Sequence, residues 1–205
     1  MTCWQDFGLL VDSYIESYTA AQLSTATLQA ALAVGSDLGG FTDHYSTAAE
    51  PFARQPATQC APRIMKVSLP VGAGWSIGAV FRVKVNGVAI DRRGLTMSHR
   101  CMRYDVECAT VIIDPAPCGN SATVDVDFTV TLDPGATPST MPDFLFTTYN
   151  QVMLWKILEY LFSMQQDHRS AQVYAQRYNT AIKQHRVHRG LGNSHIVGGA
   201  TLWRI

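Results

Sequence analysis

The side chains best suited to a binding function are basic and lie near the C-terminus. Between residues 168 and 205 there are six arginines and lysines and no aspartate or glutamate. These six are Arg169, Arg177, Lys183, Arg186, Arg189 and Arg204. Such a run of cations can contact phosphate groups, and it can equally form a solvated helix face. Over the whole chain, 16 basic and 16 acidic side chains cancel, which argues against nucleic-acid binding by the entire surface.

Side chains that could support catalysis or bind a metal do not combine into a site. Ser98 and His99 are adjacent, and neighbours in an extended strand point to opposite faces, so they cannot act as a nucleophile–base pair there. His185, His188 and His195 lie among cations without a carboxylate, which is unlike a metal site. The five cysteines hold no Cys-x-x-Cys pair and read as free thiols. We therefore predict no enzyme, no metal and no cofactor.

Helical periodicity dominates the N-terminal part of the chain. Apolar residues recur at intervals of three and four between Trp4 and Thr19, which predicts an amphipathic helix. A second helix is expected to begin at Ser24 and to end at Gly35. Glycine, proline and polar residues then indicate a linker. Residues 1–61 are thus predicted to be the N-terminal helical part of a bundle.

The apolar period changes from 3.6 to 2 after Ala61. Phe81, Val83 and Val85 alternate with basic residues and lead into Asn86-Gly87, a strong signal for a two-residue hairpin turn. Residues 62–133 are therefore expected to form an antiparallel β domain, either a sheet or a small sandwich. Its strands should place apolar side chains inward and polar side chains outward.

Two further helices are predicted between residues 134 and 185. Apolar stripes run over residues 154–161 and 171–182, and Asp167 is a natural N-cap for the second helix. Because only about four residues link the stripes, the two helices should form a C-terminal hairpin that completes the bundle.

The final segment, residues 186–205, is rich in glycine and shows no periodicity. We expect an extended basic tail there. It ends in Leu202, Trp203 and Ile205, and apolar side chains at the end of such a segment suit docking on a partner. The predicted fold class is therefore α+β, an α-helical bundle with a central antiparallel β-sandwich-like insertion and an extended C-terminal tail.

Composition narrows the classes of protein further. The chain has 205 residues, of which 47% are apolar and 16% charged, so it is long enough to bury a core and is not disordered throughout. The best candidate for a membrane helix, from Val152 to Met164, carries Lys156 and Glu159. The first seven residues lack the basic stretch of a secretory signal. We expect a protein that is made in the cytosol and does not enter a membrane.

Several motifs in order resemble one known family. They are Thr131-Leu132-Asp133-Pro134, Met141-Pro142-Asp143-Phe144-Leu145-Phe146, a helix ending near Leu161-Phe162-Ser163-Met164, and Ala171 to Tyr178 with its basic continuation. This arrangement is similar to the head-to-tail adaptor, also called head-tail connector or neck protein, of tailed bacteriophages. The chain departs from many relatives at Gln165-Gln166-Asp167, where they have a tryptophan after a proline.

The resemblance implies a structural virion protein that assembles as a homo-oligomeric ring, a dodecamer, below the portal. The ring would extend the DNA channel and join the head to the tail. Its expected partners are itself, the portal protein, a downstream tail or neck protein, and genomic DNA passing without sequence-specific binding. The expected location is the virion, after assembly in the host cytoplasm.

The same resemblance assigns roles to the basic and apolar residues of the C-terminal part. Docking into the portal is expected from residues of the tail, namely Arg186, Arg189, Leu202, Trp203, Arg204 and Ile205. Contacts with neighbouring subunits or with DNA in the channel are expected from Arg169, Arg177 and Lys183. Two alternatives remain open. One is another ring protein of the neck or tail-completion type, and the other is a nucleic-acid-binding module that uses the basic C-terminal residues 168–205. An enzyme is the third choice.

Overall fold

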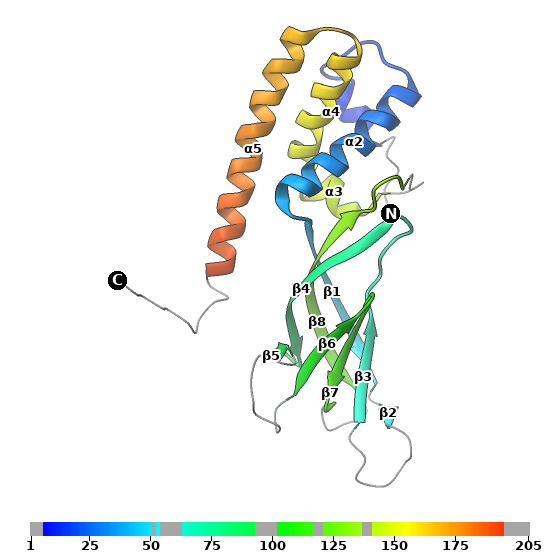
Figure 1. Ribbon diagram of the computed structural model, residues 1–205, viewed down its shortest axis with the longest axis vertical. Helices are drawn as coiled ribbons and strands as arrows, with labels where there is room; N and C mark the ends of the chain where they lie inside the picture. Colours follow the sequence, from blue (N-terminus) through cyan, green and yellow to red (C-terminus); the bar gives the residue numbers. More distant parts are fainter. Residues whose placement is uncertain are drawn as a thin grey trace, which may run out of the picture. The chain divides into compact units, whose positions relative to one another are not determined.

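The computed structural model divides the chain into two compact units (Figure 1). A helical unit comprises residues 1–39 and 137–205, and a sheet unit comprises residues 40–136. The structure describes residues 6–50, 52–53, 63–92, 102–116, 121–136 and 141–194. None of the helices within these ranges combines the length and apolar composition that a membrane crossing requires.

The helical unit contains five described helices. They are α1 (Asp6–Val11), α2 (Ala20–Leu38), α3 (Asp143–Thr147), α4 (Asn150–Met164) and α5 (His168–Ser194). Helix α4 packs against both α2 and α5, and Ile157, Leu158 and Leu161 on α4 are almost completely buried. The core of this unit is therefore built around α4.

Local signals set the ends of α2. The Thr19 side chain accepts a hydrogen bond from the backbone N–H of Gln22, and the Gln22 side chain accepts one from the backbone N–H of Thr19. This reciprocal capping box satisfies donors that the first helical turn leaves free. Gly39 ends the helix in the left-handed conformation, with φ 67°, which glycine adopts without steric cost.

The sheet unit is one mixed sheet of eight described strands. They are β1 (Phe41–Ala49), β2 (Phe52–Ala53), β3 (Arg63–Ser68), β4 (Trp75–Val85), β5 (Val88–Arg92), β6 (Arg103–Glu107), β7 (Thr110–Asp114) and β8 (Ala122–Leu132), in the order β1-β8-β4-β5-β6-β7-β3-β2. Strands β5 and β6 are parallel, and the other described pairs are antiparallel. The sheet curls like half of a barrel, so that β1 comes near β3.

The hairpin turn between β4 and β5 lies where the sequence placed it. Asn86 and Gly87 both have positive φ, 50° and 80°, as a tight primed turn requires. The Asn86 side chain also accepts a hydrogen bond from the backbone N–H of Thr123 at 2.9 Å. This residue therefore links the turn to β8 as well as closing the hairpin.

The predicted architecture is wrong in its β part. The sequence indicated an antiparallel sandwich-like insertion over residues 62–133, whereas the structure has a single, larger and mixed sheet. The sheet includes β1, which lies in the segment predicted as helical turns and linker. Small polar residues in β1 hide its period-2 pattern, and its extended form is stabilised by pairing along its full length with β8.

The predicted helical bundle completed by a C-terminal hairpin is not found either. The first helix ends at Val11 instead of near Thr19, because residues 12–18 turn back and the Tyr18 hydroxyl donates to the Gly8 carbonyl and the Asp12 carboxylate. Helix α5 has 27 residues against 15 in α4, and it runs through residues 186–194, which we had assigned to the extended tail. The local spacing of glycines was insufficient to end this helix.

Candidate functional site

Helix α5 carries the basic residues singled out by the sequence, and its start is fixed by a side-chain cap. The Asp167 carboxylate accepts a hydrogen bond from the backbone N–H of Ser170 at 3.1 Å, which confirms the predicted N-cap. Hydrogen bonds from the side chain and backbone of Ser170 hold the pKa of Asp167 below its ordinary value. Gln166, with φ 62°, makes the turn that leads into the helix.

One face of α5 is buried within the helical unit. Ala171, Tyr178, Ala181 and Ile182 are each less than 8% exposed. The Tyr178 hydroxyl donates a hydrogen bond to the carboxylate of Asp37 near the end of α2, and burial together with this bond raises the pKa of Tyr178 above its usual range. Tyr178 is therefore a core residue of the helical unit.

Arg186 also contacts the end of α2. Its guanidinium donates to the backbone carbonyl of Asp37, with Nε at 3.0 Å, and lies 4.0 Å from the Asp37 carboxylate. A cation at this position satisfies a free carbonyl and interacts favourably with the negative end of the helix. Arg186 thus has a structural contact within the chain as well as a partly exposed side chain.

The opposite face of α5 is exposed and carries no acid. Arg169 and Lys183 are exposed, and no ion pair or hydrogen bond links either side chain to another described residue. Arg177 lies over two aromatic rings of this unit, with its guanidinium carbon 5.2 Å from the centre of Trp155 and 5.4 Å from that of Tyr174. Positive charge therefore remains at the surface along this face.

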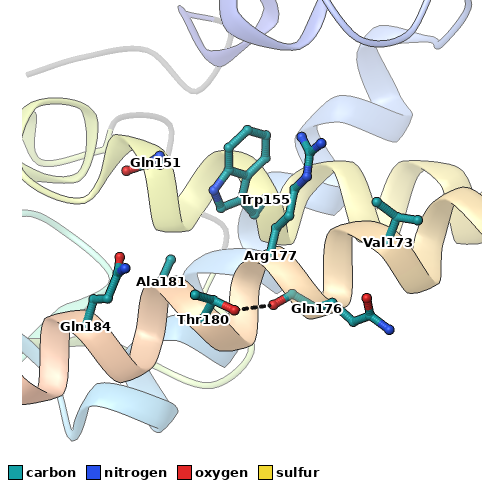
Figure 2. A pocket seen from close by; sticks show the side chains of 8 residues that line it. All are labelled: Gln151, Trp155, Val173, Gln176, Arg177, Thr180, Ala181 and Gln184. Carbon is teal, nitrogen blue, oxygen red and sulfur yellow. Dashed lines mark hydrogen bonds between the residues drawn. The ribbon is translucent and has the colours of Figure 1, made fainter.

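A groove lies beside this basic face, between α4 and α5. Its volume is about 440 Å³, and Figure 2 shows the side chains of Trp155 and Arg177 extending to the same side of it. The lining residues are Gln151 and Trp155 from α4 and Val173, Gln176, Arg177, Thr180, Ala181 and Gln184 from α5. The groove offers amides, a hydroxyl, apolar surface and one cation, but no carboxylate, thiol or imidazole. These groups can bind a ligand or a surface through hydrogen bonds, apolar contact and one positive charge.

Stacked aromatic rings support the wall of the groove. The rings of Phe162 and Tyr174 are 5.3 Å apart and nearly parallel, and Trp155 stacks on Tyr174 at 6.0 Å. Tyr14 meets both Trp155 and Tyr174 edge to face. These contacts hold Trp155 in place beneath Arg177.

The predicted site residues are only partly brought together. Arg169, Arg177, Lys183 and Arg186 lie on α5, but they point in different directions, to solvent, to the aromatic rings or to α2. Arg189 belongs to α5, and its side chain lies outside the described part of the structure. The predicted docking residues Leu202, Trp203, Arg204 and Ile205 lie outside the described residues, as do Ser98, His99 and His195.

The groove residues were not found by sequence analysis. Trp155 follows Leu154 in the chain but does not belong to the apolar stripe of Leu154, Ile157, Leu158 and Leu161, and Gln151, Gln176 and Gln184 belong to no recognised motif. Their proximity depends on how α4 packs on α5. A polar helix face without acids was the available signal, and it indicated α5 but not the groove.

A second polar cluster crosses the sheet unit. The Asp127 carboxylate on β8 contacts His44 Nδ1 on β1 at 2.6 Å and accepts a hydrogen bond from Arg82 Nε on β4. All three residues are in register on neighbouring strands. Asp127 is 8% exposed, so the cluster neutralises a nearly buried charge. Among the described residues, no group of three or more acids, histidines or cysteines could hold a metal ion.

Comparisons with known proteins do not extend this description. No protein-family model matches the chain, and no curated protein matches it.

Proposed function

We propose that this chain is a structural virion protein, the head-to-tail adaptor of a tailed bacteriophage. In this role it assembles as a ring below the portal, extends the DNA channel and joins the capsid to the tail, without catalysing a reaction. The segment after Ser194 docks into the portal, and a further tail or neck protein binds the opposite side of the ring.

The observation that carries the proposal is the exposed, acid-free face of α5. It leaves Arg169 and Lys183 without an ion partner among the described residues, and the chain continues from this helix into the segment that ends in Leu202, Trp203 and Ile205. Basic charge followed by terminal apolar residues suits a segment that docks on a partner. Repetition around a ring would multiply weak single contacts through effective concentration.

The chemistry of the groove agrees with a role that is not catalytic. General acid–base or nucleophilic catalysis needs a titrating or nucleophilic side chain beside the bound molecule. The groove between α4 and α5 has amide side chains, Arg177 and the Thr180 hydroxyl, which donates a hydrogen bond to the Gln176 backbone carbonyl at 3.0 Å. These groups can bind a surface without performing a reaction.

The proposal is tested by binding purified protein to assembled portal rings. Because α5 continues to Ser194, the informative truncation ends after Ser194 and keeps the helix intact. We expect the full-length chain to decorate portal rings in electron micrographs and the truncated chain not to do so. Trp203→Ala should weaken decoration at least tenfold, whereas Thr201→Ala serves as the matched control. Failure of the full-length chain to bind portal rings would overturn the proposal.

One observation favours a second candidate, a nucleic-acid-binding module. Arg177 lies over Trp155 beside the amides of the groove, and a cation next to an aromatic ring is a common contact for nucleic acid. A module of this kind would bind nucleic acid with an affinity that falls steeply as salt rises. An adaptor that lets DNA pass should bind it weakly at every salt concentration.

A further inference from the structure

Charges in the helical unit are segregated along the chain. Residues 6–38 contain Asp6, Asp12, Glu16 and Asp37, and no lysine or arginine occurs before Arg54. Helix α5 has the opposite composition, with five lysines and arginines and no acid. Between them, α4 has one lysine and one glutamate, which pair with each other at 3.0 Å. The unit therefore has an acidic N-terminal part and a basic C-terminal helix.

Contacts within the chain use little of this complementary charge. The ion pair that links the two parts among the described residues joins Asp37 to Arg186 at 4.0 Å, and both side chains are about half exposed. Glu16 is exposed, and no hydrogen bond or ion pair joins it to another described residue. On α5, Arg169 and Lys183 are likewise exposed, and no hydrogen bond or ion pair joins either side chain to another described residue. Charges of both signs thus remain available at the surface.

Each charged surface also exposes apolar side chains. On the acidic part, Leu9 is 77% exposed and Tyr14 is 41% exposed. On the basic part, Val173 is 44% exposed and borders the groove with Trp155. Exposed apolar groups surrounded by charges are typical of surfaces that bind another protein.

The two surfaces are carried by different elements of the helical unit, α5 on the one hand and α1 with its following turn on the other. They meet where Tyr14 lies edge to face with Trp155 and Tyr174, and α2 crosses α4 and reaches α5 through Asp37 (Figure 1). Two unlike surfaces on one molecule associate head to tail, and such heterologous contacts close into a ring when the rotation between copies allows it.

We propose that the basic face of α5 binds the acidic surface of α1 and the following turn on a second copy of this chain. The basic face is defined by Arg169, Val173 and Lys183, and the acidic surface by Leu9, Asp12 and Glu16. This inference deepens the proposed function, since it rests on the assembly of a ring and assigns the surfaces between neighbouring subunits.

The charge balance of the unit favours a second copy over nucleic acid as the partner. Its described residues include seven aspartates and glutamates and six lysines and arginines. A nucleic-acid surface normally has a clear excess of basic residues, and the acidic part of this unit would repel phosphate. Nearly equal numbers of opposite charges, carried by different elements, instead make the unit complementary to itself.

Charge reversal tests the contact. The variants are Glu16→Lys on the acidic surface, and Arg169→Glu and Lys183→Glu on the basic face. Asp12 is left unchanged because its carboxylate accepts a hydrogen bond from Tyr18. In sedimentation velocity at low salt, the wild type should self-associate, and each variant alone should associate at least tenfold more weakly. An equimolar mixture of Glu16→Lys with one of the α5 variants should restore association.

Matched controls separate this contact from a general effect of charge. Glu107→Lys and Arg92→Glu reverse exposed charges in the sheet unit and should leave association unchanged. Circular dichroism of every variant establishes that it is folded. Salt should weaken wild-type association, because the contact is partly electrostatic.

Several results would overturn the inference. It is wrong if the wild type stays monomeric at every concentration and salt, if the reversals do not weaken association, or if the mixture does not restore it. If the α5 variants instead lose binding to duplex DNA while self-association is unchanged, the basic face binds DNA. If a chain that does not self-associate still decorates portal rings, the adaptor proposal stands and this contact is refuted. If the chain self-associates through these surfaces but does not bind portal rings, the contact stands and the adaptor proposal is refuted.

Discussion

The two units of the molecule use their charged side chains in opposite ways. In the sheet unit, Asp127 on β8 is shared between His44 on β1 and Arg82 on β4, so charges are neutralised across neighbouring strands. In the helical unit, four of the seven described acids lie before residue 39, and α5 carries bases alone. The sheet therefore uses charge to hold its own strands in register, whereas the helical unit keeps charge at its surface.

Burial explains why removal of a charged side chain should lower the free energy of unfolding more in the sheet cluster than on the exposed face of α5. The Asp127 side chain is 11% exposed and that of Arg82 is 34% exposed, so removal of one partner leaves the other poorly solvated. Exposed charges such as Arg169 and Lys183 keep their water, and their loss changes stability little. Stability measurements should thus distinguish charges that serve the fold from charges that serve a partner.

The largest effect is expected from Asp127→Ala. This change removes the acceptor for Arg82 and His44, and we expect it to lower the free energy of unfolding by about 2–3 kcal/mol. Urea denaturation measures the loss. Asp125→Ala is the matched control, because Asp125 lies on the same strand and its hydrogen bond with Ser46 is exposed. Its cost should stay below about 1 kcal/mol, and equal losses for the two variants would contradict the proposed role of Asp127.

A smaller loss is expected where β4 bulges against β8. A Cβ on Gly78 would lie 2.8 Å from Oγ1 of Thr129, the oxygen that accepts a hydrogen bond from the backbone N–H of Ala79 at 2.8 Å. Gly78→Ala should therefore cost about 1–2 kcal/mol through this clash. Thr129→Ala removes the oxygen, so the double variant should lose less than the sum of the two single losses. Additive losses would show that the clash is elsewhere.

Tyr178→Phe tests the buried link between α2 and α5. Loss of the hydrogen bond to Asp37 should lower the free energy of unfolding by about 1 kcal/mol near neutral pH. The pKa of Tyr178 is raised from the ordinary value of 10.0. Its contribution is therefore fully present below pH 10 and is lost as the pH rises further, because the unfolded state then releases the proton more readily.

The pH dependence supplies the control for this variant. Wild-type stability should fall above pH 10, and the fall should be shallower in Tyr178→Phe, as followed by urea denaturation at several pH values. The fall should not vanish, because burial and the hydrogen bond to Asp12 also raise the pKa of Tyr18, to about 12. The same slope in both proteins would exclude Tyr178 as a source of the alkaline loss.

The sequence predicted features that depend on neighbouring residues and missed those that depend on distant ones. The turn at Asn86-Gly87 and the cap at Asp167 are local, and both are present. Strand β1 was missed because its pairing partner β8 lies about eighty residues further along the chain. The parallel pairing of β5 with β6 likewise has no local signature.

The same distinction applies to the candidate site. The acid-free composition of α5 could be read directly from the sequence, and it indicated the basic face. Tertiary packing decides which of these basic side chains stay free of contacts. Arg169 and Lys183 are exposed, whereas Arg177 packs on aromatic rings and Arg186 binds the end of α2. Spacing along a helix gives the direction of a side chain but does not identify its neighbour.

The smallest effect on stability is expected from charge reversal on the exposed face of α5. Lys183→Glu should change the free energy of unfolding by less than about 0.5 kcal/mol, because the side chain is solvated and no described residue pairs with it. Arg186→Glu is the matched comparison on the same helix. It removes the hydrogen bonds to the Asp37 carbonyl and places a second carboxylate near Asp37, so it should cost about 1 kcal/mol or more. Thermal and urea unfolding of both variants measure the difference. If Lys183→Glu destabilises the chain as much as Arg186→Glu does, then Lys183 stabilises the fold. The exposed charges of α5 could then not be distinguished by stability from the charges that make contacts within the chain.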